Sequence, residues 1–213
     1  CLCSISDLNC FMKHYFPLLL IILLALFLRT HRLDDVPPGF RVDELSNSFV
    51  VSQHVLEGEY RFFFTDASGH EGLWHLLQAG FMGIFGRTTF GMRGINILLG
   101  TLTIPLTYVV GKELFDRRVG LLAATMLAVS FWSLMYSRTA IRHVSSVVFL
   151  LGAFYWFLRG MQARIRYPRF GYGLAGLLMG IGLHTYFAAW VMVAVLGAAV
   201  VFLLLFDREK LAG

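Results

Sequence analysis

Two acidic segments hold the residues best suited to moving a proton. In RVDELSNS, Asp43 and Glu44 begin a stretch of helical spacing. The positive end of a helix stabilises an ionised carboxylate by about 0.3–1 kcal/mol. In GHEGLWH, His70 and Glu71 stand directly before an apolar helix, where an acid is costly to bury. Both segments therefore suit general-base chemistry, while helix capping by Asp43 and a solvated loop position for Glu71 are the simpler alternatives.

Cationic residues that could bind an anion follow later in the chain. The segment YSRTAIRHVSS contains Arg138, Arg142 and His143. A guanidinium suits phosphate, because it can bind two phosphate oxygens through parallel hydrogen bonds. The structural alternative is that these cations snorkel to the membrane interface or pair with the acids of the first loop. Three further polar residues near the ends of apolar runs complete the candidate substrate-binding set: Arg93, His184 and Tyr186.

Carboxylates and cations together favour two kinds of function. In an enzyme, a carboxylate takes the proton of an attacking hydroxyl while a guanidinium stabilises a phosphate leaving group. The same set also suits a non-enzymatic transporter or assembly subunit that binds an anionic ligand in an outer cavity. Both interpretations require the charged segments to meet on one side of a membrane.

The composition places these segments in an integral membrane protein. The 213 residues are 57% hydrophobic and their mean hydropathy is +0.69, whereas soluble chains are roughly 45–50% apolar. Lysine and arginine number 18 against 13 acids, an excess typical of cytoplasmic loops rather than of nucleic-acid binding. Because Cys1, Cys3 and Cys10 all precede the first apolar run, they predict neither a disulfide framework nor a zinc site.

Six apolar runs predict membrane-spanning helices, because a crossing needs about 20 mostly apolar residues. The runs are Tyr15 to Leu28, Gly94 to Val110, Val119 to Tyr136, Val144 to Leu158, Phe170 to Leu183 and Phe187 to Phe206. A seventh run, Gly72 to Phe85, is short and contains His75 and Gln78, which suits an interfacial or re-entrant helix as well as a crossing. The predicted fold is an all-α, polytopic transmembrane bundle of six to seven spans.

Basic residues predict the orientation of this bundle, since lysine and arginine accumulate in short cytoplasmic loops. With six alternating spans, three basic segments lie together in the cytoplasm, and their basic residues are Lys112, Arg117, Arg118, Arg159, Arg164, Arg166, Arg169, Arg208 and Lys210. Counting Gly72 to Phe85 as a crossing would turn all of them outward, so we expect this helix not to cross. The links 30–93, 137–143 and 184–186 then share the outer side.

Residues 31–71 form the predicted first extracytoplasmic loop, and their charge is inverted relative to the rest of the chain. They hold eight of the 13 acids but only three of the 18 lysines and arginines. A Pro-Pro-Gly sequence breaks the chain, and Asp43 to Leu56 then places apolar residues at helical spacing. We expect a juxtamembrane amphipathic helix there, lying along the membrane surface with Asp43 at its start.

The order of these segments resembles the membrane glycosyltransferases of the GT-C fold, especially bacterial relatives of protein O-mannosyltransferases and of lipid A aminoarabinose transferases. The likeness rests on an N-terminal span, VDELSNS in an acidic loop, HEGLWHLLQA, and FGMRGINILLGTLTIPLTYVVGKELFDRRVGLLAATMLAVSFWSLMYSR. It extends from Leu18 to Trp190 and is strongest over 93–138. Since members are usually longer, the resemblance implies that residues 1–213 are the N-terminal transmembrane catalytic module of such an enzyme.

The resemblance implies inverting transfer of a sugar from a polyprenyl-phosphate donor, reached from the membrane lipid, to a hydroxyl of a protein or glycolipid acceptor at the outer face. It maps the base to Asp43 and a second acid to Glu71, although relatives often carry proline where this chain has Gly72. No cofactor is required, but the acids permit a divalent cation. A bacterial inner membrane is the expected location.

Two residue sets follow from the segments and the resemblance together. The predicted catalytic residues are Asp43, Glu44 and Glu71, and the predicted substrate-binding residues are His70, Arg93, Arg138, Arg142, His184 and Tyr186. The transporter or assembly subunit remains the alternative. Transporters often carry internal repeats and charges deep within their spans, and the sequence shows neither.

Overall fold

The computed structural model describes residues 5–66, 69–161 and 168–206. Cys1, Cys3, Arg164, Arg166, Arg208 and Lys210 lie outside these ranges, as does the side chain of Cys10. The described chain is mostly helical, as predicted. Its elements are α1 (Ile5–Thr30), α2 (Val42–Leu45), the π-helix η1 (Ser46–Val51), α3 (Ser52–Leu56), β1 (Phe63–Phe64), β2 (His70–Glu71), α4 (Gly72–Phe85), α5 (Thr89–Leu114), α6 (Arg117–Val129), α7 (Phe131–Ser137), α8 (His143–Met161), α9 (Pro168–Leu183), the 3-10 helix η3 (Phe187–Ala189) and α10 (Trp190–Phe206).

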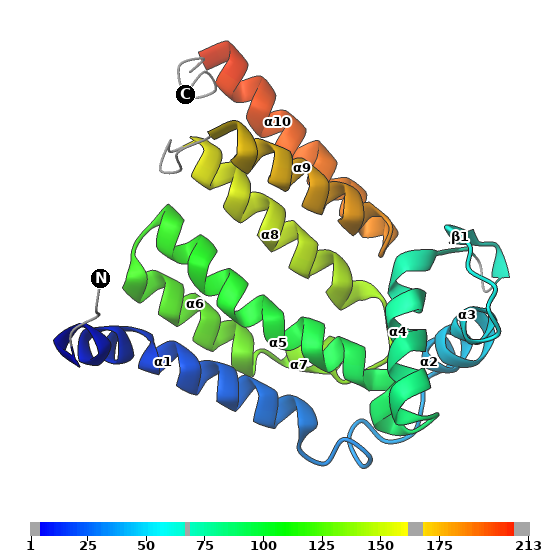
Figure 1. Cartoon of the computed structure of the whole chain (residues 1–213). Coiled ribbons are helices and arrows are strands. Elements are labelled where there is room, and N and C mark those ends of the chain that lie inside the picture. The colour runs from blue at the N-terminus through cyan, green and yellow to red at the C-terminus, as the bar shows by residue number, and fades with distance from the viewer. Residues whose placement is uncertain (1–4, 67–68, 162–167, 207–213) are drawn as a thin grey trace.

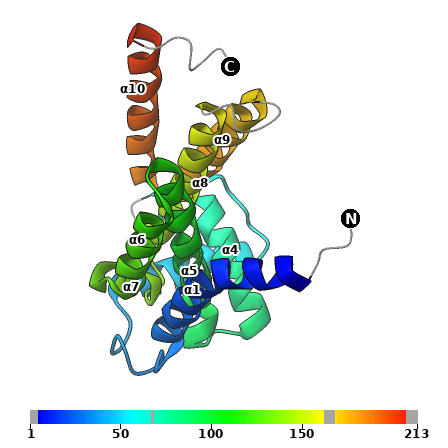
Figure 2. The same cartoon turned by 90° about the vertical axis from the view of Figure 1, so that its left-hand side faces the viewer.

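Six helices run back and forth along one bundle (Figure 1). In chain order α1, α5, α6, α8, α9 and α10 alternate in direction, so that α1, α6 and α9 begin at the same end at which α5, α8 and α10 finish. Figure 2 shows the bundle from this end. α1 packs on α5 and α6, α5 packs on α8, and α8 packs on α9. This alternation agrees with the predicted path of the chain, in which the basic segments share one side.

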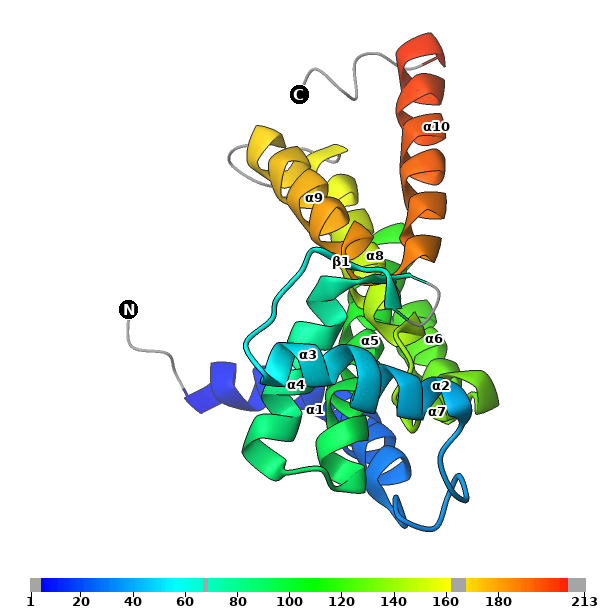
Figure 3. The ribbon, with the colours of Figure 1, turned by 90° about the vertical axis from the view of Figure 1, so that its right-hand side faces the viewer.

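The opposite end of the bundle is covered by the first loop and α4. Figure 3, seen from that end, shows α2 and α3 lying across the front of the bundle. α4 has the predicted bounds and packs against α3 and α5, with Trp74 in an apolar cluster that includes Ile95 of α5 and Val144 of α8. Its 14 residues are fewer than the about 20 needed for a crossing. This placement supports the expectation that α4 does not cross.

Fewer helices than the sequence predicts are long enough to cross a membrane. Among the described residues, three helices are long and apolar enough to cross a membrane: Thr89–Leu114, His143–Met161 and Phe187–Phe206. The bent pair α6 and α7 makes a fourth if it acts as one span. The remaining predicted spans correspond to shorter apolar helices, Tyr15–Thr30 and Arg169–Leu183. Of the predicted six to seven spans, three to four therefore meet the length requirement.

The predicted span Val119 to Tyr136 is broken rather than straight. α6 and α7 meet at 59°, because Ser130 between them has an extended backbone with ψ 129°. Arg29 of α1 stabilises the break by donating to the backbone carbonyl of Ala128 at 3.4 Å and to the Ser133 hydroxyl at 2.7 Å. A continuous helix would bond that carbonyl itself. A partner that stabilises the bend therefore lies on another helix, where the pattern of this run cannot reveal it.

The predicted amphipathic helix of the first loop exists as the consecutive segments α2, η1 and α3. Unlike an amphipathic helix of a soluble protein, it exposes apolar side chains and buries polar ones. The apolar side chains Leu45, Phe49, Val50 and Leu56 are exposed, while Glu44, Asn47, Ser48 and Ser52 are buried. An exposed apolar side suits contact with lipid. The buried polar side requires hydrogen-bond partners, and these partners build the site.

Candidate active site

A polar pocket of about 210 Å³ lies at the α4 end of the bundle. Four separate stretches of the chain line it, and their residues are Asp43, Ser46, Asn47, His70, Ile141, Arg142, His143, Tyr186 and Phe187. The structure thus brings together four of the nine predicted site residues, Asp43, His70, Arg142 and Tyr186. Glu71 adjoins them through its ion pair with Arg142.

Asp43 is the acid best placed to act as a base. It is exposed, it belongs to α2, and it lines the polar pocket. No hydrogen bond or ion pair engages its carboxylate within the described part of the chain. A carboxylate in this condition can accept the proton of a hydroxyl bound in the pocket.

One wall of the polar pocket is formed by the ion pair of Glu71 and Arg142. Arg142 Nη1 lies 2.5 Å from Glu71 Oε2, and the side chains are 11% and 14% exposed, respectively. Burial lowers the pKa of Arg142, and the Glu71 carboxylate acts in the opposite direction. The guanidinium also lies 5.6 Å from the centre of the Tyr186 ring. Among the described residues its other N–H groups make no hydrogen bond, so they can bind an anion.

The backbone around Gly72 places Glu71 at the start of α4. β1 and β2 pair in antiparallel fashion, an element absent from the prediction, with Phe63 opposite Glu71. The N–H of Gly72 donates to the carbonyl of Phe62 at 2.9 Å, and a Cβ at Gly72 would lie 2.1 Å from the Arg61 carbonyl oxygen. Proline has no N–H and carries a Cβ, so it cannot occupy this backbone position. The backbone that holds Glu71 at the start of α4 therefore accepts glycine at position 72 but not proline.

Two histidines connect the polar pocket with the interior. His70 Nδ1 lies 3.1 Å from Nε2 of His75, which is fully buried in α4. Burial, with a smaller effect from the charges of His70 and Arg142, lowers the pKa of His75 to about 2. His75 is therefore neutral at physiological pH. On the other side of the pocket, His143 Nε2 lies 3.0 Å from the Tyr186 hydroxyl.

Glu44 and Arg93 lie outside the polar pocket and form a buried ion pair. Both are 1% exposed, and Arg93 Nε lies 2.9 Å from Glu44 Oε1. The carboxylate also accepts from the backbone N–H groups of Ala140, at 2.8 Å, and Arg41, at 3.1 Å. Arg93 further donates to carbonyls of the first loop, those of Leu33, Pro37 and Gly39. The pair therefore fastens the first loop to α5 and to the link before α8.

Arg138 caps the end of α1 instead of facing the polar pocket. Its guanidinium donates to the backbone carbonyls of Leu28, His31, Arg32 and Val36. Carbonyls at a helix end lack partners within the helix, and a cation there is favoured by the helix dipole. Burial, and secondarily the charge of Arg93, lowers the pKa of Arg138. Its N–H groups are committed to the first loop.

His184 also lies away from the polar pocket. Its side chain is exposed, and its ring centre lies 6.0 Å from that of Phe62. Its backbone carbonyl accepts from the N–H of Leu73 at 3.2 Å, which ties the end of α9 to the start of α4. The position of His184 is thus compatible with a structural role through its backbone.

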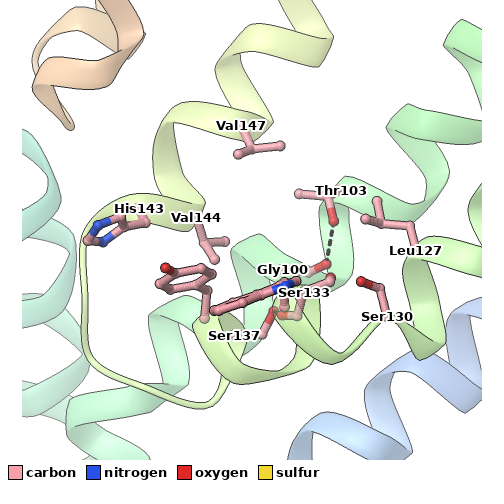
Figure 4. A pocket seen from close by; sticks show the side chains of 11 residues that line it. Gly100, Thr103, Leu127, Ser130, Ser133, Ser137, His143, Val144 and Val147 are labelled. Atoms are coloured by element: carbon pink, nitrogen blue, oxygen red, sulfur yellow. Dashed lines mark hydrogen bonds between the residues drawn. The ribbon is translucent and has the colours of Figure 1, made fainter. Parts of the chain in front are cut away.

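An apolar cavity of about 280 Å³ adjoins the polar pocket at His143, which lines both. It lies between α5, the break of α6 and α7, and the start of α8 (Figure 4), and its lining residues are Gly100, Thr103, Leu127, Ser130, Trp132, Ser133, Tyr136, Ser137, His143, Val144 and Val147. Nδ1 of His143 is buried and has no hydrogen-bond partner among the described residues. A polar pocket and an apolar cavity that share a wall suit a ligand with a polar head and an apolar tail.

The described residues do not assemble a metal cage. No group of three or more histidine, cysteine, aspartate or glutamate side chains among them is arranged to hold a metal ion. Of the described residues, Asp43 is the single carboxylate that lines the polar pocket. The described residues therefore do not by themselves form a site for the divalent cation that the sequence allowed.

Sequence reasoning missed three residues of this region. Asn47 lines the pocket and donates to the carbonyl of Ala140 at 2.9 Å, and its position four residues after Asp43 puts both on one helix face. His75 lies four residues after Glu71, a spacing that could have linked it to the same face. His143 was recognised in its segment but received no role, because its neighbours become known only when the link between α9 and η3 brings Tyr186 close.

Comparison with known proteins identifies the family and the fold. Residues 73–212, more than half of the chain, match the family described as dolichyl-phosphate-mannose-protein mannosyltransferase. No curated protein matches the chain. Solved structures of the Archaeoglobus fulgidus oligosaccharyltransferase do match. Its apo form has a TM-score of 0.74 and 18% identity over 94% of this chain and 27% of that chain.

Two further structures of the Archaeoglobus fulgidus oligosaccharyltransferase agree with this result. The form tethered to an acceptor peptide with the NVT sequon has a TM-score of 0.74 and 17% identity, covering 94% of this chain and 28% of that one. The complex with an inhibitory peptide and a dolichol-phosphate has a TM-score of 0.73 and 19% identity, covering 93% and 27%. At these identities the likeness shows the fold, and this chain spans little more than a quarter of those proteins. The GT-C resemblance is confirmed, and the chain belongs to the dolichyl-phosphate-mannose-protein mannosyltransferase family.

Proposed function

We propose that this chain transfers a sugar from a polyprenyl-phosphate donor to a hydroxyl of a protein or glycolipid acceptor, with inversion, at the outer face of the membrane. The observation that carries the proposal is the Asp43 carboxylate, which pairs with none of the described residues, in the same pocket as Arg142 and beside an apolar cavity. The family supports sugar transfer. The dolichol-phosphate held by one oligosaccharyltransferase structure supports a lipid-linked donor.

The proposed step needs one base and one cation. Asp43 takes the proton of the acceptor hydroxyl while its oxygen forms a bond to the anomeric carbon. The bond from that carbon to the phosphate oxygen breaks, and its electron pair leaves with the polyprenyl phosphate. Attack opposite to the departing phosphate inverts the anomeric carbon. The N–H groups of Arg142 that no described residue engages stabilise the charge that develops on the phosphate.

The other predicted site residues have different places in this proposal. Glu71 holds Arg142 in place, and His70 and Tyr186 face the sugar or the acceptor. We assign Glu44, Arg93 and Arg138 to holding the first loop, because their polar atoms are occupied by that loop and its neighbours. Substrate binding by His184 stays a prediction.

The apolar cavity suits the part of the polyprenyl chain nearest the phosphate. It meets the polar pocket at His143, so a lipid there would present its phosphate towards Arg142. Exposed apolar side chains on α2, η1 and α3 would keep the first loop at the membrane surface. A bacterial inner membrane, and the role of residues 1–213 as the N-terminal catalytic module, stay predictions.

The test compares Asp43→Asn with wild type in the full-length protein that contains this chain, reconstituted in liposomes with radiolabelled polyprenyl-phosphate sugars. A general base contributes about 10²–10⁴-fold, so Asp43→Asn should lower transfer at least about a hundredfold. Asp34→Asn is the matched control, because Asp34 is an exposed acid of the same loop outside the pocket. Near-normal turnover in Asp43→Asn would refute the assignment of the base.

The same experiment addresses the alternative function. If folded wild-type protein bound an anionic lipid but transferred no sugar from any donor, a transporter or assembly subunit would replace the enzyme as the best interpretation. Transfer by wild type that disappears with Asp43 excludes that alternative.

A further inference from the structure

Asn47 lines the polar pocket beside Asp43, and the proposed reaction does not use it. The residue belongs to η1 and is 3% exposed. Asp43 precedes it by four residues, so the two side chains share one helix face, and both reach the pocket. A side-chain amide buried to this extent needs a partner for its nitrogen and for its oxygen.

The amide nitrogen of Asn47 is committed to the link before α8. Nδ2 donates to the backbone carbonyl of Ala140 at 2.9 Å. The backbone N–H of Ala140 in turn donates to Glu44 Oε1 at 2.8 Å. Two side chains of the first loop therefore hold both polar groups of Ala140, which stands two residues before Arg142. The position of Asn47 relative to Arg142 is thus set through Ala140.

The amide oxygen of Asn47 is the atom that remains for a ligand. A backbone carbonyl can only accept, so the amide nitrogen must face Ala140 and the oxygen must point elsewhere. None of the described residues donates a hydrogen bond to this oxygen. It is also absent from the described polar atoms that are shut off from solvent without a partner. The oxygen must therefore reach open space, and the polar pocket is the space that Asn47 lines.

The chemistry of this oxygen selects its partner. An amide oxygen accepts but cannot donate, so it cannot form a hydrogen bond with an ionised phosphate, which also only accepts. The proposed reaction places the phosphate at Arg142 and the attacking hydroxyl at Asp43, and the single proton of that hydroxyl goes to Asp43. The sugar lies between these two groups. Its hydroxyls are therefore the donors that remain for Asn47.

We propose that Asn47 is a specificity-determining residue whose amide oxygen accepts a hydrogen bond from one hydroxyl of the donor sugar. The sugar as the ligand rests on the proposed function, whereas the available oxygen rests only on the contacts of Asn47. A sugar that lacks this hydroxyl is disfavoured, because the amide oxygen would then lose both the pocket water and its new partner.

The test measures donor binding by the full-length protein in lipid nanodiscs, with wild type, Asn47→Ala and Ser48→Ala. The probes are polyprenyl-phosphate mannose, glucose and galactose, polyprenyl phosphate without a sugar, and each monodeoxy form of the sugar that binds most tightly. Mannose is included because the description of the family names it. Ser48→Ala is the matched control, since Ser48 is the next residue, is also buried, and accepts from Gln78 at 2.9 Å without lining the pocket.

In wild type, one deoxy form should have a Kd about tenfold higher than the complete sugar, the effect of one hydrogen bond. Asn47→Ala should raise the Kd of the complete sugar about tenfold but leave the Kd of that deoxy form unchanged, so the difference between them disappears. The Kd of polyprenyl phosphate without a sugar should not change, because Glu44 and Asn96 continue to hold the link before Arg142. Ser48→Ala should keep the full wild-type difference.

Three results would overturn the inference. The first is a wild type that binds every deoxy form as tightly as the complete sugar, or no sugar more tightly than the sugarless lipid. This result can be read even if Asn47→Ala does not fold. The second is a hydroxyl preference that survives in Asn47→Ala, which would assign the contact to another residue. The third is an equal loss of affinity for all probes in Asn47→Ala, which would indicate a structural role through Ala140.

The same measurements separate this inference from the proposed function. Binding needs no turnover, so a hydroxyl preference that depends on Asn47 can be observed even if no sugar is transferred, which would refute only the reaction. Transfer that depends on Asp43 but shows no hydroxyl preference in donor binding would refute only the contact with Asn47.

Discussion

Glu44→Gln should destabilise the protein strongly without acting on the polar pocket. The substitution removes the counter-charge from Arg93, which is 1% exposed. Breaking a buried ion pair on one side costs about 3–5 kcal/mol. Arg93 keeps the carbonyls of Leu33, Pro37 and Gly39, so we expect the lower end of this range, about 3 kcal/mol.

The assay for this prediction is a double-mutant cycle on the free energy of unfolding in mixed micelles, with Glu44→Gln, Arg93→Met and the double variant. A direct interaction requires the double variant to be more stable than the sum of the single effects predicts, by about 0.5–3 kcal/mol. The residual transfer activity of folded Glu44→Gln should stay within a few-fold of wild type. A stability close to wild type together with a hundredfold loss of transfer would refute the structural assignment and return Glu44 to the catalytic residues.

Two further predictions concern the bundle and α4. A Cβ on Gly100 would lie 2.0 Å from the Ser137 hydroxyl oxygen, so Gly100→Ala should cost about 1–3 kcal/mol of unfolding free energy, whereas Gly80→Ala, where nothing lies within 4 Å, should gain about 0.5–1 kcal/mol. His75 takes up a proton near pH 6.5 when unfolded but only near pH 2 when folded, so stability should fall by about 2 kcal/mol between about pH 7.5 and pH 5. The free energy of unfolding, measured by urea or SDS titration at both pH values, checks this prediction. The fall in stability should be smaller in His75→Asn than in wild type, because the variant lacks the imidazole. An equal fall in both proteins would contradict the prediction.

Much of the fold could be predicted from hydropathy and charge. The bounds of α4 agree with the prediction, and the alternating path of six apolar helices follows from the distribution of basic residues. The break at Ser130 could not be predicted, because Arg29 stabilises it from α1. A long-range partner of this kind leaves no periodic signal in either segment.

The arginines show why the site was harder to predict than the fold. Arg93, Arg138 and Arg142 have the same side chain and all lie near ends of helices at one side of the bundle. Arg93 and Arg138 are directed to backbone carbonyls of residues 28–39, whose path depends on the folded first loop. Only Arg142 keeps N–H groups for the polar pocket. Residue type and side of the membrane were therefore enough to list the candidates but not to sort them.

The reversed sides of the first-loop helix connect membrane contact with the site. Glu44, Asn47 and Ser52 must face inward, because they hold the ion pair, the link before α8 and the hydrogen bonds to α4. At helical spacing, inward polar residues force the apolar residues of the same helix outward. In water that exposed apolar side would favour aggregation, whereas at a lipid surface it is stabilising. The same spacing that brings Asp43 to the polar pocket therefore also suits a position of the pocket at the membrane surface, where the proposed lipid-linked substrate would present its phosphate.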